Sequence, residues 1–274
     1  MSIRQLVRDW LSEFPRADGL FRRLIWSRIH FPEVELRVLN DLGPGSLDIA
    51  IDVGAALGCY CWVLERCSRE VYAFEPGLEH ASYLEANAPS SVKLVCAAVG
   101  ERGGTVGMYM GSADREGRHT ATLSESNPIA SRAPFVRRVD QVSLDEFFRD
   151  ILAPGRSIDL LKVDVEGYEN AVLIGAATII RGHHPVIICE IERRHNPRYA
   201  EVFEMLMEVG YECYAWFDGR YQPFSLDLMD RFQSEEALNS RLSGAGRHAG
   251  TYINNFIFQH PLGLLNLVSS SSVS

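Results

Sequence analysis

Short apolar runs that alternate with helix-like segments constrain the fold of this chain most strongly. Seven runs are typical of strands: Leu47–Val53, Glu70–Phe74, Val92–Val95, Ile158–Val163, Pro185–Glu190, Tyr211–Phe217 and Tyr252–Phe258. The earlier runs lack a clear polar alternation, as expected for parallel strands that are buried on both faces. A long polar stretch, rather than a crossover helix, joins the last two runs, which predicts an antiparallel pair at a sheet edge. The sequence therefore predicts an α/β fold with a mainly parallel sheet and covering helices.

Two of the intervening helices have clear boundary signals. Residues 197–209 carry an apolar stripe, and Asn196 is a plausible N-cap with Pro197 in the first helical position. Gly210 follows the expected end of this helix. The second signal, Ser143–Glu146, matches a capping box ahead of two phenylalanines.

Composition shifts along the chain suggest three parts. Residues 1–45 form an N-terminal helical extension, and residues 46–260 form the main domain. Within that domain, a segment at about 100–142 is rich in Gly, Arg, Ser and Thr and is interpreted as an insertion with two or three small strands. Long inserted segments of this kind often act as lids over a site. Residues 261–274 end in SSSSVS and are expected to be disordered.

The overall composition limits the class of protein. The 274 residues fit one large α/β domain, and 46% apolar with 23% charged residues is typical of a globular protein. Acidic residues outnumber basic ones by 36 to 27, which gives a formal net charge of -9. We expect no nucleic-acid partner, because such a chain repels phosphate backbones.

Cysteine use and hydropathy bear on the cellular location. The six cysteines form no C-x-x-C pair, and such thiols suit a reducing cytoplasm, where we expect the protein to act. The sequence has no run of 18 apolar residues, so a membrane-spanning helix is not expected. Residues 3–12 predict an amphipathic helix, for which we favour packing on the domain over peripheral contact with a membrane.

A glycine turn follows the first strand. Asp52 is followed by Gly54 and Gly58, and the segment then runs into a helix-like stretch. A strand, a glycine turn and a helix N-terminus together bind nucleotide-like ligands, because glycine permits close backbone approach and the helix offers N–H groups. The G-x-x-x-G spacing differs from the G-x-G-x-x-G of dinucleotide-binding proteins.

An acidic residue ends the second strand. Glu75 follows Asp52 by 23 positions, and an acidic side chain at this place accepts hydrogen bonds from both ribose hydroxyls of an adenosine. An isolated glutamate would be interpreted as a solvated loop residue. The preceding glycine turn favours ribose binding instead.

The fourth strand carries charges where an apolar run ends. Lys162, Asp164 and Glu166 occupy alternate positions, so in an extended chain they share one face. A lysine and two carboxylates at the carboxyl end of a central strand are typical of a catalytic site. A purely structural ion-pair network remains the alternative interpretation.

Three sequence blocks together resemble one known family. These blocks are IDVGAALGCYCWVL, VYAFEPGLEHASYLEANAP and LLKVDVEGYENAVLIGA, and the later CEIERRHN and NNFIF stretches are also similar. They resemble the FkbM-type S-adenosylmethionine-dependent methyltransferases over roughly residues 47–260. Residues 100–142 match loosely, through GERGGTV and VSLDEF.

The resemblance implies a Rossmann-like fold with a seven-stranded sheet, helices on both faces and an antiparallel hairpin of the last strands. It also implies S-adenosylmethionine as the cofactor, with the turn holding its amino-acid end and Glu75 its ribose. The expected cofactor-binding residues are Asp52, Gly54, Ala55, Gly58, Glu75 and Pro76. Two positions differ from the family pattern, which often has Asn at Ala56 and a small polar residue at Cys61.

The implied reaction is O-methylation of a hydroxyl on a sugar, a glycan or a natural product, with a small molecule or glycan as acceptor. Asp164 is the first candidate for the general base, with Glu166 and Glu190 next, and Lys162 completes the expected catalytic set. Four histidines also stay open as candidates: His119, His183, His184 and His195. We expect no metal, because no third carboxylate has a diagnostic spacing.

Two alternatives come from other functional classes. A nicotinamide-dependent oxidoreductase would share the strand, the turn and the acidic ribose ligand, but it is disfavoured because G-x-G-x-x-G is missing. A non-catalytic adenosine-binding module would need the carboxylates Asp164 and Glu166 only for structure.

Overall fold

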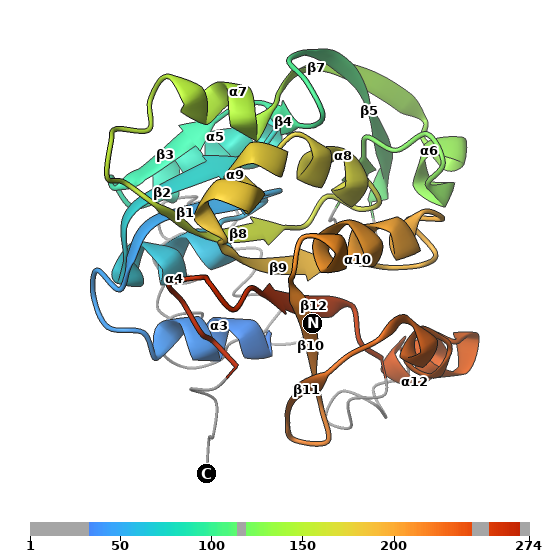
Figure 1. Ribbon diagram of the computed structural model, residues 1–274. Helices are drawn as coiled ribbons and strands as arrows, with labels where there is room; N and C mark the ends of the chain where they lie inside the picture. Colours follow the sequence, from blue (N-terminus) through green and yellow to red (C-terminus); the bar gives the residue numbers. More distant parts are fainter. Residues whose placement is uncertain (1–32, 114–118, 243–251, 269–274) are drawn as a thin grey trace, which may run out of the picture.

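The computed structural model describes residues 33–113, 119–242 and 252–268, which form two sheets with helices around them (Figure 1). The larger sheet has the strand order β11-β10-β12-β9-β8-β1-β2-β3. Its strands are β1 (Leu47–Val53), β2 (Ser68–Phe74), β3 (Val92–Val95), β8 (Ile158–Val163), β9 (Val186–Glu190), β10 (Glu212–Phe217), β11 (Arg220–Pro223) and β12 (Asn255–Gln259). The amphipathic segment 3–12 and the SSSSVS tail lie outside the described residues.

The large sheet confirms the predicted mixed topology. Strands β3, β2, β1, β8 and β9 run parallel, and β12 pairs antiparallel with both β9 and β10. The sheet has eight strands rather than the seven expected, because β11 folds back onto β10. Asp218 and Gly219, with φ of +51° and +79°, form the tight turn between them. A four-residue edge strand is too short for hydrophobic periodicity to predict.

Helices cover both faces of the large sheet. On one face lie α3 (Val34–Asn40) and α4 (Cys59–Cys67), and on the other α7 (Leu144–Arg149), α8 (Glu169–Ile174), α9 (Ala177–His183) and α10 (Tyr199–Glu208) (Figure 1). The remaining helices are α5 (Leu78–Asn87), α6 (Pro128–Arg132), the 3₁₀ turn η1 (Leu226–Leu228), α11 (Met229–Phe232) and α12 (Glu235–Leu242). All six residues of β8 are buried, as its apolar sequence predicts for a central strand.

The two predicted helix starts have different outcomes. The Ser143 hydroxyl accepts a hydrogen bond from the N–H of Glu146 at 3.4 Å, which confirms the predicted cap of α7. Helix α10 begins at Tyr199, later than predicted, although the Asn196 side chain makes a bond typical of an N-cap by accepting from the N–H of Arg198. The Asn196 amide also donates to the buried carboxylate of Glu169, so tertiary contacts fix its role.

The second sheet comes mostly from the segment between residues 100 and 142. Its order is β4-β7-β5-β6, with β4 (Ala98–Val99), β5 (Gly104–Ala113), β6 (His119–Thr122) and β7 (Phe135–Val142). Its buried side chains form a small core of their own, which includes Met108 and Leu123. This sheet lies against the carboxyl ends of the large sheet's strands and forms one side of the pocket described next.

Candidate functional site

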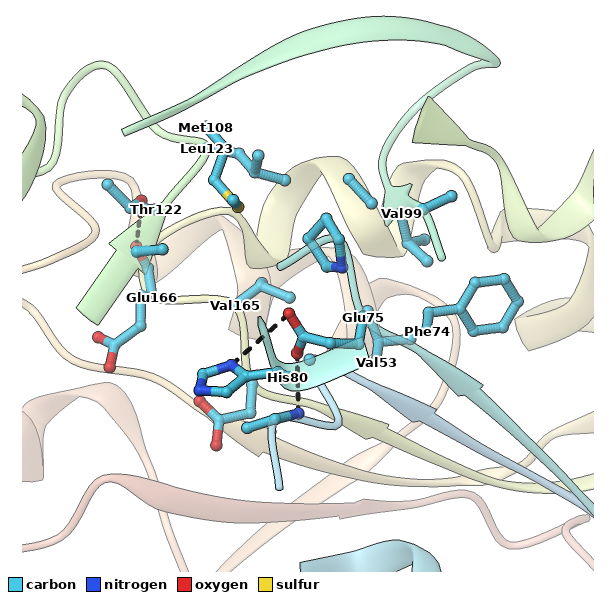
Figure 2. Close-up of a pocket in the computed structure, with 17 residues that line it drawn as sticks. Val53, Phe74, Glu75, His80, Val99, Met108, Thr122, Leu123, Val165 and Glu166 are labelled. Carbon is cyan, nitrogen blue, oxygen red and sulfur yellow. Dashed lines mark hydrogen bonds and ion pairs between the residues drawn. The ribbon is translucent and has the colours of Figure 1, made fainter. Parts of the chain in front are cut away.

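A pocket of about 200 Å³ lies where β1, β2 and β8 end, between the two sheets (Figure 2). Its walls are mostly apolar, with Phe74 and Val53 from the large sheet, Met108 from β5 of the second sheet and Leu123 directly after β6. Its polar lining residues are Glu75, His80, Thr122, Asp164 and Glu166. Pockets at the carboxyl ends of parallel strands are the usual ligand sites of such sheets.

The glycine turn brings β1 directly against the loop that follows β8. Gly54 has φ of +81°, and a Cβ there would lie 1.8 Å from the carbonyl oxygen of Asp164. The N–H groups of Gly54 and Ala55 both donate to the Phe74 carbonyl, at 3.0 and 3.2 Å. Only glycine fits this position, because the backbone of Asp164 fills the space that a side chain would need.

The turn ends at helix α4. Gly58 is the N-cap residue with φ of +81°, and no side chain among the described residues caps this helix end by a hydrogen bond. Asp52 lies behind the turn, 2% exposed, where it accepts a hydrogen bond from the Cys61 thiol at 3.2 Å. Burial raises the pKa of Asp52 to about 6. Of the turn residues predicted from sequence, Gly54 lines the pocket, whereas Asp52, Ala55 and Gly58 shape the turn behind it.

Glu75 lies at the pocket wall where β2 ends, beside Pro76. Its two oxygens accept hydrogen bonds from the N–H groups of Ala56 and Gly77, at 2.8 and 2.7 Å. A carboxylate has about four lone-pair sites, so both oxygens can still accept from a ligand. Ala56 belongs to the glycine turn and has φ of +46°. Its backbone N–H therefore orients the Glu75 carboxylate from the turn.

His80 is a pocket residue that the sequence analysis missed. Its Nδ1 lies 3.8 Å from an oxygen of Glu75, and this contact raises the pKa of His80 (Figure 2). It lies on the first turn of α5, directly after the Glu75 loop. No spacing or motif distinguishes it from a surface histidine, so the sequence offers no signal for it.

The residues predicted at the end of β8 take three different places. Lys162 is buried inside the strand, with its Nζ 3.7 Å from Asp164, and Asp164 lines the pocket. Glu166 also lines the pocket, but its φ of +50° takes it out of the extended conformation that the alternation assumed. Its carbonyl oxygen accepts hydrogen bonds from Thr122 Oγ1 and Asn127 Nδ2, each at 2.6 Å.

Lys162 is surrounded by acidic groups. Burial lowers its pKa, but the negative charges of Asp164, Glu33 and Glu190 have the larger effect, so the pKa of Lys162 is raised. Its ammonium also lies 5.0 Å from the centre of the Tyr60 ring. The pKa of Glu190 is raised in turn, by burial and by the charge of Asp164.

The loop after β9 adds a histidine to this group. His195 Nδ1 lies 2.6 Å from an oxygen of Glu166 and 3.9 Å from an oxygen of Glu192. Glu192 is itself paired with Arg194 and accepts from Tyr252 and Asn254. The structure thus joins the candidates Glu166 and His195, which lie 29 positions apart in the sequence.

The other candidate histidines lie elsewhere. His183 and His184 follow α9 and precede β9, so they are at the opposite end of the sheet from the pocket. The ring of His184 stacks on that of His260, with 4.0 Å between the ring centres. The side chain of His119 lies outside the described parts of the chain.

Two searches over residues 33–113, 119–242 and 252–268 gave no positive result. No group of three or more His, Cys, Asp or Glu side chains there is arranged to hold a metal ion. No helix in those ranges combines the length and apolar character needed to cross a bilayer.

The parallel sheet, the glycine turn after β1 and the carboxylate after β2 define a Rossmann-like protein, a class that often binds nucleotide-containing cofactors at this edge of the sheet. The family model of the methyltransferase FkbM domain matches residues 52–213, which is more than half of the chain. The protein belongs to the FkbM methyltransferase family. No curated protein has a significantly similar sequence.

Solved structures with a similar fold include an FkbM methyltransferase from Methylobacillus flagellatus KT, with 14% identity and a TM-score of 0.45. The match covers 85% of this chain and 47% of that one, so this chain spans about half the length of that protein. An O-methyltransferase from Bacillus cereus in complex with SAH has 12% identity, 92% and 96% coverage and a TM-score of 0.44. An rRNA methylase from Streptococcus thermophilus has 13% identity, 85% and 98% coverage and a TM-score of 0.43.

Proposed function

We propose that this protein transfers the methyl group of S-adenosylmethionine to a hydroxyl group of a sugar, a glycan or another natural product. The observation that carries the proposal is the pocket at the carboxyl edge of the sheet. It has a ribose-type carboxylate, Glu75, on the β2 side and two further carboxylates, Asp164 and Glu166, on the β8 side. Membership of the FkbM family supports the transfer of a methyl group.

The residues present fit this cofactor. Gly54 and Ala56 line the pocket, so the backbone of the turn can face the amino-acid end of the cofactor. Glu75 can accept hydrogen bonds from the ribose hydroxyls, while Phe74, Val99 and Leu123 offer apolar surface to an adenine ring. The carboxylates at the β8 side suit a positively charged sulfonium.

When bound, the cofactor supplies a methyl group with an electrophilic carbon. The protein's own contribution is to hold the acceptor oxygen in line with the bond that breaks, and such positioning supplies about 7–11 kcal/mol of barrier reduction. Met108 and Leu123, from the second sheet and the loop after it, cover the pocket and keep water from the methyl group. Asp164 lies with Lys162 beside the same site and contributes negative charge.

We also propose that the reaction takes place in the cytoplasm. All six cysteines of the chain are free thiols in the structure, and the thiols of Cys61, Cys189 and Cys213 are buried. A reducing compartment keeps thiols in this form.

Calorimetric titration with S-adenosylhomocysteine and S-adenosylmethionine tests the cofactor assignment. We expect both to bind the wild type, and Glu75→Ala to weaken binding by about 10- to 100-fold, because hydrogen bonds to a charged group are worth about 1.5–3 kcal/mol. Glu85→Ala, an exposed glutamate on α5, is the matched control and should bind as the wild type does. Equal binding by Glu75→Ala would contradict the proposed site.

The same protein distinguishes the alternative functions. Titration with a nicotinamide dinucleotide tests the oxidoreductase interpretation, which requires binding in place of S-adenosylhomocysteine. Radiolabelled S-adenosylmethionine with a panel of monosaccharides, methyl glycosides and polyhydroxylated natural products tests methyl transfer. Cofactor binding without transfer to any hydroxyl of the panel would favour the non-catalytic module over the enzyme.

A further inference from the structure

We propose that His195 is the general base of methyl transfer and that Glu166 is the positioning residue that orients its ring. This inference rests on the proposed O-methylation, because a hydroxyl acceptor has to lose a proton as its oxygen is methylated. General-base catalysis needs a group that accepts this proton within hydrogen-bond reach of the acceptor. The contacts around the loop after β9 assign that role to a histidine rather than to the carboxylates of β8.

The geometry of the His195 ring carries the first step. Its Nδ1 lies 2.6 Å from Oε2 of Glu166, and Glu166 lines the pocket. A negative charge this close to Nδ1 favours the neutral tautomer with its proton on that nitrogen, which leaves Nε2 as the proton acceptor. The His195 side chain is 12% exposed and lies beside Glu166, the residue through which it is linked to the pocket.

Glu166 is held in place from two sides. Its backbone has φ of +50°, a conformation that costs energy for a residue with a side chain, and Thr122 and Asn127 hold its carbonyl oxygen at 2.6 Å each. The next residue, Gly167, has φ of +96°, and a Cβ there would lie 2.4 Å from the carbonyl oxygen of His195. The second sheet thus fixes Glu166, and Gly167 allows the His195 loop to approach it.

A second carboxylate, that of Glu192, stabilises the positive charge that forms on the His195 ring. Glu192 Oε2 lies 3.9 Å from His195 Nδ1, and the N–H of His195 donates to the Glu192 carbonyl at 2.9 Å. Burial raises the pKa of Glu192, but Arg194, His195 and Tyr252 together lower it below its usual value, which favours the ionised carboxylate. The charged groups that face the imidazole are therefore Glu166 and Glu192, with Arg194 paired to the latter.

The other candidate bases, Asp164 and Glu190, already interact with other charged or polar groups of the protein. Asp164 is paired with the buried ammonium of Lys162, at 3.7 Å. Glu190 is partly buried and accepts a hydrogen bond from Asn254, and burial together with the charge of Asp164 raises its pKa well above the usual value.

The proposed step balances in atoms and charge. The acceptor oxygen forms a bond to the methyl carbon while the carbon–sulfur bond breaks, and the electron pair of that bond neutralises the sulfonium. The acceptor's proton moves to Nε2 of His195, and the imidazolium is stabilised by Glu166 until it returns the proton to water.

The test uses radiolabelled S-adenosylmethionine with the hydroxyl panel named above and three variants. We expect His195→Gln to lower kcat by about 100- to 10,000-fold, the usual contribution of a general base, with the Kd for S-adenosylhomocysteine within about twofold of wild type. His183→Gln, at the far end of the sheet, is the matched control and should keep wild-type turnover. Wild-type kcat in His195→Gln would overturn the inference.

The pH–rate profile separates positioning by Glu166 from a structural role. In the wild type, turnover should fall on the acidic side as the base becomes protonated. Glu166→Gln should move this acidic limb to lower pH, because the carboxylate that stabilises the imidazolium is gone. An unshifted limb would overturn the positioning role, and this variant also decides the question if His195→Gln does not fold.

Failure of the proposed function has a different signature. A wild type that binds S-adenosylhomocysteine but methylates no hydroxyl in the panel contradicts O-methylation, and the base loses its role with it. A wild type that does not bind S-adenosylhomocysteine contradicts the cofactor assignment. Full turnover in His195→Gln leaves both assignments intact and removes only the base.

Discussion

At the ends of β1 and β2 the pocket is built from one short stretch of chain, whereas at the ends of β8 and β9 it is built from several distant ones. The first half, which we assign to the cofactor, uses residues 53–80 and offers backbone groups, apolar surface and one buried carboxylate. The second half, which we assign to the acceptor, brings together Asp164, Glu166, Glu190 and His195. A strand–turn–helix unit is thus enough to form a cofactor site, but a proton-transfer site needs charges that oppose one another across separate loops.

The largest effect is expected in the acceptor half, from Lys162→Met. Removing this ammonium leaves buried carboxylates without a counter-charge, which should lower the free energy of unfolding by about 3–5 kcal/mol at pH 7. Lys162 also stabilises the negative charge of the buried Glu35, whose pKa burial raises to about 7. The loss of stability should therefore be smaller at pH 5, where the Glu35 carboxyl group is protonated. Urea unfolding at the two pH values measures both.

Lys93→Met is the matched control, since Lys93 is the other lysine of the chain and is exposed at the surface beside Glu70. It should cost less than about 1 kcal/mol. Equal losses for the two lysines would contradict the difference between the buried and the exposed ion pair.

Gly54→Ala tests the cofactor half. The positive φ alone costs about 1–2 kcal/mol, and contact of the new Cβ with the Asp164 carbonyl adds about 1–3 kcal/mol of overpacking. Gly155→Ala has the same φ of +81° with nothing within 4 Å of the added Cβ, so it isolates the cost of the backbone conformation. Thermal unfolding should show the larger loss for Gly54→Ala, and equal losses would mean that β1 does not contact the β8 loop as closely as described.

Asn127→Asp probes the link between the second sheet and the acceptor half. The new carboxylate can still accept from the N–H of Ile129 and cap α6, but it cannot donate to the Glu166 carbonyl. The Glu166 carbonyl keeps its bond from Thr122, but a buried carboxylate oxygen then faces it with no proton between the two oxygens, so we expect a loss of about 1–3 kcal/mol in urea unfolding. Asn87→Asp removes a similar amide-to-carbonyl bond to Tyr83 on α5, away from the pocket, and should cost less.

The smallest effect is expected from His80, and it depends on pH. The Glu75 contact raises the pKa of His80, so the imidazolium is favoured as pH falls through the folded-state value. Positive charge there repels the sulfonium of S-adenosylmethionine but not the neutral S-adenosylhomocysteine. Because a charge pair 4 Å apart in water interacts by about 1 kcal/mol, the affinity for S-adenosylmethionine relative to S-adenosylhomocysteine should fall by up to about fivefold between pH 8 and pH 6.

His80→Gln should make this ratio independent of pH in calorimetric titrations. Glu79, on the same helix, also faces His80 but is paired with Arg137, so it remains as a constant background in both proteins. A pH-dependent ratio that persists in the variant would assign the effect to another group.

The sequence by itself determined the layout of the fold and one half of the site. Continuous apolar runs predicted the strands β1, β3 and β8 at their observed limits, because burial on both faces leaves a local pattern. The glycine turn and the Glu75 carboxylate could be predicted for the same reason, since the hydrogen bonds that link them involve Phe74, Ala56 and Gly77, which lie close by in the sequence.

Only the tertiary structure decided the acceptor half of the site, at the ends of β8 and β9. The extended alternation placed Glu166 with Lys162 on one face, but Glu166 adopts a left-handed conformation, in which its carbonyl accepts from Thr122 of β6 and from Asn127 at the start of α6. Its approach to His195 depends on two loops that leave neighbouring strands, and no local pattern encodes that distance. Periodicity reports which side chains are buried, whereas the pairing of charges depends on which chain segments the fold brings together.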